Sequence, residues 1–169
     1  FKTPLLPVEA THLKQRKEYY ETGDGDVFWE GELRLRQIFD SFAGDDNSEY
    51  ILRHADFDSI CKTRRENYAA LLDALTAPLH GVQVVFPELP EATVPSHFCL
   101  YAENRERFQQ YLTDHQIRST VYWPVGPLVH PLPDSSEQYI YDHIVSVPCD
   151  QRFTPSDMQY VAQVLMDYS

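Results

Sequence analysis

The stretch Arg64-Arg65-Glu66-Asn67-Tyr68 lies inside the longest helical pattern of the chain, which covers residues 56–77. Asp56 stands at its start, where an aspartate side chain caps the free backbone N–H groups of a first helical turn. Pro78 and Gly81 follow the pattern and end a helix. Apolar residues recur along one stripe of it: Phe57, Ile60, Cys61, Tyr68, Leu71, Leu72 and Leu75. We therefore expect a long helix that buries one face.

Strand and helix patterns alternate after this helix. Residues 82–86 and 97–102 are rich in β-branched and aromatic residues, with prolines in the loop between them. Further patterns predict a helix capped by Asn104, a strand over residues 118–122, a short helix over 136–142, a strand over 143–147 and a last helix starting at Thr154-Pro155. This last helix is predicted to bury Met158, Val161, Ala162, Leu165 and Tyr168. The order predicts an α+β fold with a small, mostly antiparallel sheet of about four strands covered by helices.

The first 55 residues differ from the rest. Residues 1–8 hold two prolines and few charges, which indicates an extended linker. A polar helix is predicted over residues 10–20 and a second helix up to Gly44, followed by a turn at residues 45–48. Because the chain starts at Phe1 without an initiator Met, we expect residues 1–55 to be a helical segment connecting to an upstream domain. Residues 56–169 then form a separate, small domain.

Composition limits the classes of partner. The 169 residues carry 26 Asp and Glu against 14 Lys and Arg, a formal charge of -12, which opposes binding to nucleic acid or to an anionic membrane surface. No run approaches the about 20 apolar residues of a membrane helix. Three widely spaced cysteines predict neither a disulfide framework nor a zinc site, and a reducing, cytoplasmic setting fits them.

The segment from Tyr122-Trp123-Pro124 to His130-Pro131 is the best candidate for ligand contact. A loop stiffened by Pro and Gly after a strand holds aromatic faces and an imidazole in place at little entropic cost. We therefore predict Tyr122, Trp123 and His130 as substrate-binding residues. The alternative is that the two aromatic side chains pack the core and that His130 caps a turn.

Other candidate sites have weaker support. Arg64 lies on the apolar stripe, where it could pair with an acid of the N-terminal segment or reach a carboxylate or phosphate at a domain interface. Cys149 follows His143 by six residues, but a third orienting group is not evident, so a buried free thiol is expected. Asp24-Gly25-Asp26 lacks the later ligands of a calcium loop, because Phe28 and Leu35 occupy those positions. We predict neither a metal site nor a catalytic residue in this chain.

The order of these features resembles the C-terminal small domain of sugar aminotransferases of the DegT/DnrJ/EryC1/StrS type, which are fold-type I pyridoxal phosphate enzymes. The resemblance covers roughly residues 56–165 and depends on order and spacing. It rests on the helix containing Arg64-Arg65-Glu66-Asn67-Tyr68, the helix from Asn104-Arg105 to Gln116-Ile117, the segment ending at His130-Pro131, and Ser146-Val147-Pro148 followed by Thr154-Pro155.

The resemblance implies a homodimeric parent protein whose upstream domain holds pyridoxal phosphate on a lysine and whose small domain forms one wall of the substrate cleft. It also implies that the segment 122–131 lies at the active-site entrance. The four lysines here are Lys2, Lys14, Lys17 and Lys62, and none stands in a phosphate-binding Gly/Ser context. We therefore expect part of an aminotransferase-like enzyme for a keto or amino sugar or a related small metabolite, inactive on its own and without bound cofactor. The alternative is a non-catalytic binding module with the same fold.

Overall fold

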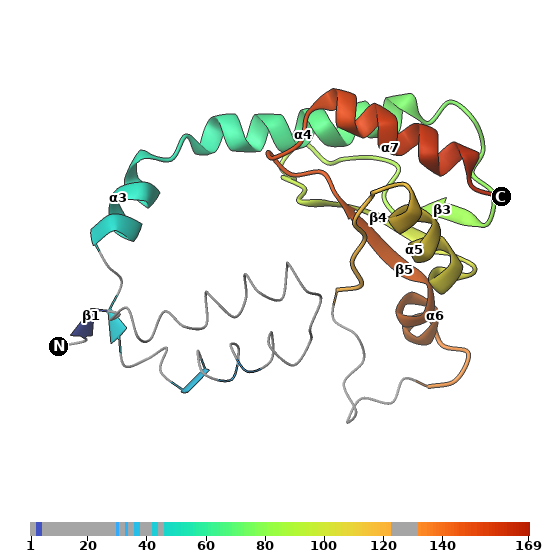
Figure 1. Ribbon diagram of the computed structural model, residues 1–169, viewed down its shortest axis with the longest axis horizontal. Helices are drawn as coiled ribbons and strands as arrows, with labels where there is room; N and C mark the ends of the chain where they lie inside the picture. Colours follow the sequence, from blue (N-terminus) through green and yellow to red (C-terminus); the bar gives the residue numbers. More distant parts are fainter. Residues whose placement is uncertain are drawn as a thin grey trace. The chain divides into compact units, whose positions relative to one another are not determined.

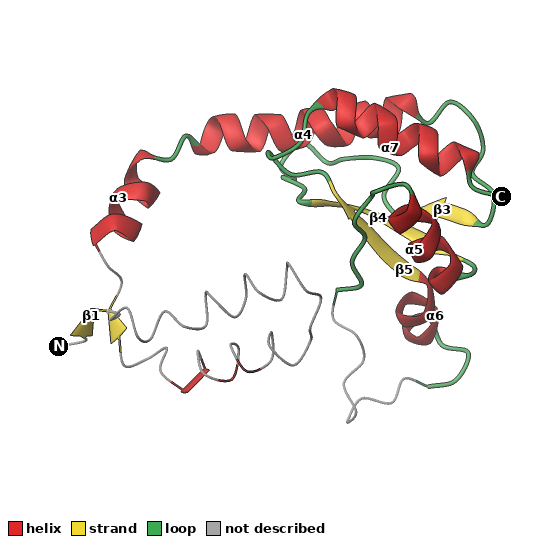
Figure 2. Cartoon of the chain, in the orientation of Figure 1, coloured by secondary structure: helices red, strands yellow, loops and turns green. Residues whose placement is uncertain are grey.

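The computed structural model describes residues 46–122 and 132–169 continuously, and outside these only residues 3–4, 30, 33, 36–37 and 42–43. The chain divides into two compact units, Phe1–Ala55 and Asp56–Ser169. Figure 1 traces both units, and Figure 2 colours their helices and strands.

The first unit holds a two-stranded pair and a helix among its described residues. Strand β1 (Thr3–Pro4) pairs in parallel with β2 (Phe42–Ala43), and α3 spans Asp46–His54. The prediction of a helix up to Gly44 is therefore wrong at residues 42–43, where pairing with residues 3–4 holds the backbone extended. The predicted turn at residues 45–48 is also wrong, since α3 begins there. The helix predicted over residues 10–20 lies outside the described residues.

Helix α4 (Phe57–Ala74) is the long helix predicted from the sequence, ending three residues early. The Asp56 side chain accepts a hydrogen bond from the Ser59 backbone N–H at 2.9 Å, which confirms its role as the cap. Tyr68 and Leu71 are buried, but Phe57 is 52% exposed, so the predicted apolar stripe is buried only in the second half of α4. Figure 1 shows why, because the second half lies beside α7 (Pro155–Asp167) and the first half extends beyond it.

The sheet of the second unit has three antiparallel strands in the order β3 (Val82–Val84), β4 (His97–Ala102) and β5 (Ile144–Pro148). The α+β class and the antiparallel pairing are confirmed, whereas the expected fourth strand at residues 118–122 is not formed. Thr120 alone makes a bridge to Ser146, through two backbone hydrogen bonds of 2.9 Å. One bridge holds this segment beside β5 without extending the sheet.

The core lies between one face of the sheet and helices α4, α7 and α5 (Arg105–Asp114). Side chains alternate along β4, so that Phe98, Leu100 and Ala102 point into the core. Asn104 caps α5 as predicted, and Thr154 and Asp157 form a reciprocal capping box at the start of α7. All five residues predicted to be buried on α7 are buried. The short helix α6 (Ser136–His143) contacts β4 and has no buried residue.

Candidate functional site

The second face of the sheet carries polar side chains. Alternation along β4 places His97, Cys99 and Tyr101 on the side opposite to Phe98 and Leu100. Cys99 is paired in register with Ser146 of β5, and the Cys99 Sγ atom lies 3.7 Å from the Ser146 Oγ atom. Two neighbouring strands therefore present a thiol, a hydroxyl and an imidazole outside the hydrophobic core.

A depression with a volume of about 760 Å³ lies over this face. This volume is within the range of small-molecule sites, about 300–1,000 Å³. Its walls come from β4, β5, α6 and the segment before the undescribed residues 123–131. The lining residues are Ser96, His97, Cys99, Tyr122, Glu137, Ile140, Tyr141, Ile144 and Ser146. All of these described lining residues belong to the Asp56–Ser169 unit.

Tyr122, His97 and Ser96 form a connected polar group at the wall of the depression. The Tyr122 hydroxyl lies 2.9 Å from Nε2 of His97, and the two rings meet edge to face with centroids 4.7 Å apart. The Ser96 hydroxyl lies 2.9 Å from Nδ1 of His97. Both ring nitrogens of His97 are therefore engaged, which fixes the orientation of the imidazole and of the Tyr122 phenol.

The surroundings of His97 favour its neutral form. Burial lowers the pKa of His97, and the nearby Arg152 and Arg64 guanidinium groups lower it further, while the Asp150 carboxylate acts in the opposite direction. A neutral imidazole carries one N–H, so one of its two hydroxyl partners donates to the ring and the other accepts from it. Near neutral pH, this group is an uncharged hydrogen-bonded chain.

We expect the pKa of His97 to make stability sensitive to acid. The folded-state pKa lies below the unfolded value of about 6.5, so the unfolded chain binds the proton first as the pH falls. The stabilisation by neutral His97 is thus present above pH about 6.5 and is lost as the pH falls through the folded pKa. NMR titration of the His97 ring, assigned with His97→Asn, measures this directly. A midpoint at or above about 6.5 would contradict the expectation.

Tyr122 is one of the three predicted ligand-contact residues. It lines the depression, and 48% of its surface is exposed. Trp123 and His130 lie outside the described residues. His97, Cys99 and Ser146 were not predicted from the sequence, although the apolar alternation of Phe98, Leu100 and Ala102 was a usable signal. If those three face the core, the residues between them must face the opposite side.

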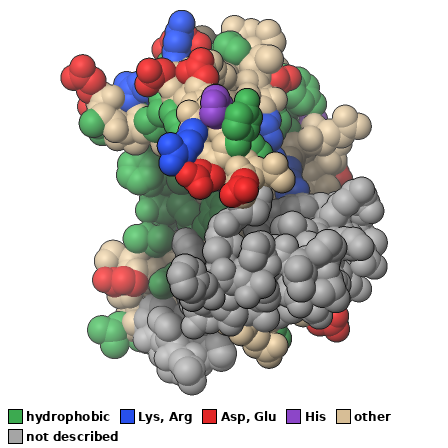
Figure 3. Space-filling model, turned by 90° about the vertical axis from the view of Figure 1, so that its left-hand side faces the viewer, with side chains coloured by type: hydrophobic (Ala, Val, Ile, Leu, Met, Phe, Trp, Pro, Cys, Tyr) green, Lys and Arg blue, Asp and Glu red, His purple; other side chains and the backbone are tan. Residues whose placement is uncertain are grey.

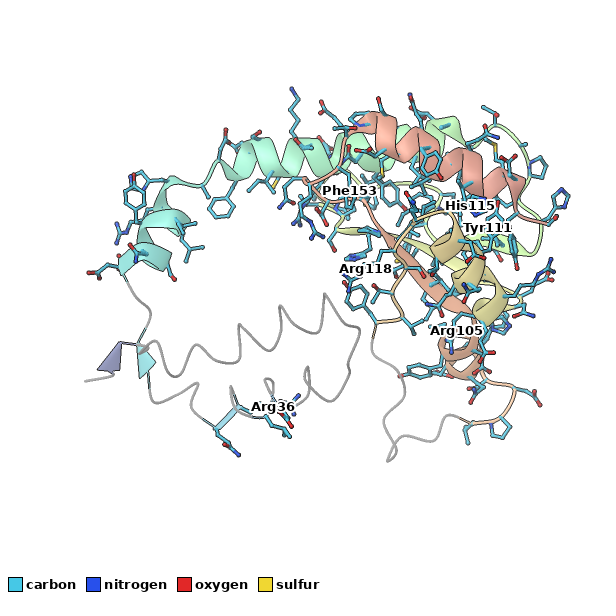
Figure 4. All side chains as sticks on the ribbon, in the orientation of Figure 1. Arg36, Arg105, Tyr111, His115, Arg118 and Phe153 are labelled. Atoms are coloured by element: carbon cyan, nitrogen blue, oxygen red, sulfur yellow. The ribbon has the colours of Figure 1, made fainter. Side chains whose placement is uncertain are left out.

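The loop between β5 and α7 is held against α4 by polar contacts. The buried Asn67 side chain donates from Nδ2 to the backbone carbonyls of Cys149, Asp150 and Phe153 at 3.4, 3.0 and 2.9 Å. Among the described residues, Arg64 Nε donates to the side-chain amide oxygen Oε1 of Gln151 at 2.7 Å. Figure 4 labels Phe153 at the start of α7.

An ion pair within this loop lies close to the depression. Arg152 donates to both carboxylate oxygens of Asp150, at 2.8 and 2.6 Å. These hydrogen bonds hold the pKa of Asp150 below its usual range. Asp150 is therefore a buried, charged carboxylate whose partner is adjacent in the same loop.

Cys149 is an inert thiol. It is fully buried, and burial raises its pKa to about 12, while His143 Nδ1 is bonded to the Tyr139 carbonyl at 2.8 Å. We expect iodoacetamide at pH 8 to leave Cys149 unmodified in the folded chain and to modify it fully in denaturant, because only the thiolate reacts. Peptide mass spectrometry measures the modification of Cys149 in both states. Equal labelling in the two states would show that Cys149 is accessible.

The described residues do not fit a covalent pyridoxal phosphate site. Lys62 is the one lysine among them, and its ammonium group lies 3.8 Å from Glu66 on the surface of α4 with 75% of its side chain exposed. A Schiff-base lysine needs an enclosed site beside the cofactor. Within residues 46–122 and 132–169 and the few described before them, His, Cys, Asp and Glu form no group that could hold a metal ion.

The charged side chains of the described part are mixed in sign. On the face drawn in Figure 3, Lys and Arg lie among Asp and Glu and do not gather in one patch. A search of the described helices finds none with the length and apolar character of a membrane span.

Three solved structures share the fold. The sugar aminotransferase CalS13 from Micromonospora echinospora aligns with 21% identity and a TM-score of 0.55, over 68% of this chain and 32% of its own. DesV from S. venezuelae, solved in complex with a ketimine intermediate, aligns with 20% identity and a TM-score of 0.57, over 69% and 33%. AtS13 from Actinomadura melliaura aligns with 19% identity and a TM-score of 0.56, over 68% and 32%.

The comparison of folds detects a similarity that the comparisons of sequences do not. No protein-family model and no curated protein sequence matches the chain. The matched region is about a third of the length of each of the three solved chains. The predicted resemblance is thus confirmed at the level of fold: the chain carries the fold of about one third of a sugar aminotransferase of the DegT/DnrJ/EryC1/StrS type.

Proposed function

We propose that this chain is the C-terminal part of a pyridoxal phosphate-dependent, aminotransferase-like enzyme that acts on a keto or amino sugar or a related small metabolite. The observation that carries the proposal is the fold shared with the sugar aminotransferase CalS13 and with DesV and AtS13. Residues 56–169 are the small domain, and residues 1–55 connect it to an upstream cofactor-binding domain. The parent is a homodimer in this proposal. The three free cysteines of this chain, Cys61, Cys99 and Cys149, fit a cytoplasmic protein.

The small domain supplies a wall of the substrate cleft in this proposal. Tyr122 is the described member of that wall, and Trp123 and His130 are proposed to extend it. The depression beside Tyr122 supports the assignment, because it has a suitable volume and combines apolar walls with a few polar groups.

The lysine that forms the Schiff base is proposed to lie upstream of Phe1. The surface position of Lys62 and its ion pair with Glu66 support this view. The test is to add pyridoxal phosphate to the parent protein and to this chain, reduce both with borohydride, and map the adducts by mass spectrometry.

We expect one stoichiometric lysine adduct upstream of Phe1 in the parent and only scattered surface labelling in this chain. A Lys62→Arg variant is the matched control, since it keeps the charge and should not change the labelling of the parent. A stoichiometric adduct on a lysine of this chain, or no specific adduct in the parent, would contradict the proposal.

A non-catalytic binding module with the same fold is the second candidate. The observation that favours it is that all described lining residues of the depression belong to the Asp56–Ser169 unit. A module of this kind would bind its ligand without an upstream domain, and its parent would show no lysine adduct in the borohydride experiment.

A further inference from the structure

We propose that the depression on the second sheet face binds an uncharged, hydroxyl-bearing ring such as a pyranose, and that His97 positions the Tyr122 phenol that contacts it. This inference rests on the proposed function for its choice of a sugar, and names the part of the substrate that this chain holds. Every residue that the proposed site includes is described in the structure.

The Tyr122–His97 contact differs from the other tyrosine–histidine pairs of the described residues. In Tyr50–His54, Tyr111–His115 and Tyr139–His143 the partners are four residues apart at the end of a helix. Each His there donates from Nδ1 to the tyrosine backbone carbonyl, at 2.7 to 2.8 Å, which satisfies a carbonyl of the last helical turn. Figure 4 labels one such pair, Tyr111 and His115, at the end of α5.

The contact between Tyr122 and His97 does not cap a helix end. The partners are 25 residues apart, and the bond runs from the phenol hydroxyl to the ring nitrogen. Ser96 holds the other ring nitrogen, so the imidazole is fixed from both sides. A phenol that donates to Nε2 keeps its oxygen lone pairs free to accept a ligand hydroxyl. The arrangement therefore orients one polar atom at the wall of a cavity.

The chemistry of the lining selects the class of ligand. Hydroxyl groups come from Ser96, Tyr122 and Ser146, and apolar surfaces come from Ile140, Ile144 and Tyr141. A pyranose presents C–H faces to apolar and aromatic surfaces and hydroxyl groups to hydrogen-bonding atoms.

Charge on the lining excludes phosphate. Among the described lining residues neither Lys nor Arg occurs, and the acidic Glu137 is present. Backbone and hydroxyl hydrogen bonds lower the pKa of Glu137, so it is anionic near neutral pH. A phosphate or carboxylate group would meet this negative charge, and the guanidinium groups near His97, those of Arg64 and Arg152, already hydrogen-bond Gln151 and Asp150. The ring of a sugar substrate fits the depression, and a phosphate group does not.

The test is direct binding to the full 169-residue chain by ligand-observed and ¹H–¹⁵N NMR, with methyl β-D-glucopyranoside and glucose 6-phosphate as probes. We expect saturable binding of the methyl glucoside in the low millimolar range, with shifts at Cys99 and Ser146, and weaker binding of the phosphate. Tyr122→Phe should weaken binding about tenfold, the effect of one lost hydrogen bond. Tyr139→Phe is the control, because Tyr139 is a similarly exposed tyrosine outside the lining.

The positioning role of His97 is tested by a double-mutant cycle. If His97 acts through Tyr122, His97→Ala weakens binding in the native background and has no further effect in the Tyr122→Phe background. Equal losses in both backgrounds would overturn the positioning role. Unsaturable binding of the methyl glucoside, an unchanged affinity of Tyr122→Phe, or a preference for the phosphate would overturn the site. Since this assay needs no cofactor, its failure is distinct from failure of the borohydride test.

Discussion

Phe98→Ala should lower the free energy of unfolding by about 3–5 kcal/mol, the cost of removing a large buried aromatic side chain. Phe98 is fully buried in the central strand β4, and its ring centroid lies 4.8 Å from that of Tyr68 on α4. The truncation leaves a cavity where the sheet meets the helix. Since small domains are stable by only about 5–15 kcal/mol, much of the stability would be lost. Urea unfolding followed by circular dichroism measures the change.

Phe86→Ala is the matched control, because this ring is 57% exposed. We expect it to change stability by less than about 1 kcal/mol. If Phe98→Ala does not fold, Phe98→Leu is measured in its place. We expect Phe98→Leu to lower the free energy of unfolding by about 1–2 kcal/mol. If Phe98→Ala lowers the free energy of unfolding by less than about 1 kcal/mol, the Phe98 side chain of β4 is not part of the hydrophobic core.

Asn67→Ala should lower the free energy of unfolding by about 2–4 kcal/mol, because it removes the side-chain donor from the carbonyls of Cys149 and Phe153, while the Asp150 carbonyl keeps its bond from the Phe153 backbone N–H at 3.1 Å. One amide group holds three carbonyls of residues 149–153, the loop that precedes α7. We expect that loop to become the first site of local opening. Urea unfolding gives the stability, and hydrogen exchange at residues 149–157 locates the opening.

The control for Asn67 is Gln110→Ala. Gln110 makes an exposed side-chain hydrogen bond of 2.9 Å to Asp114, one turn along α5, and its loss should change stability by less than about 0.5 kcal/mol. Similar losses for the two variants, or unchanged exchange in the loop, would refute the anchoring role of Asn67.

The starts of α4, α5 and α7 were predictable because their signals are local. The caps at Asp56, Asn104 and Thr154 each accept a hydrogen bond from the backbone N–H three residues on, so residue type and spacing were sufficient. Strand β4 also agrees with the prediction, because its alternating pattern is long enough to define both faces.

The predictions failed where distant partners decide the backbone. Residues 118–122 have strand-like composition, yet only Thr120 finds a partner on β5. Residues 42–43 have a helical apolar pattern but pair with residues 3–4. Such pairings depend on tertiary contacts, which can override local propensity.

The candidate site was predictable only in part for the same reason. Tyr122 stands in a segment whose prolines, glycine and aromatic residues drew attention to it. His97 lies 25 residues earlier, on a strand of ordinary composition, and only the folded arrangement brings its ring to the Tyr122 hydroxyl. A hydrogen bond between side chains on separate elements leaves no periodic pattern in the sequence.

Sequencing the transcript upstream of the Phe1 codon tests most directly whether this chain is part of an aminotransferase-like enzyme. We expect a reading frame that continues upstream of Phe1 until the whole frame is about twice as long as this chain, and that encodes a cofactor-binding domain with a lysine in a phosphate-binding context. A start codon directly before Phe1 would contradict the account, and would favour the binding module in place of the enzyme part.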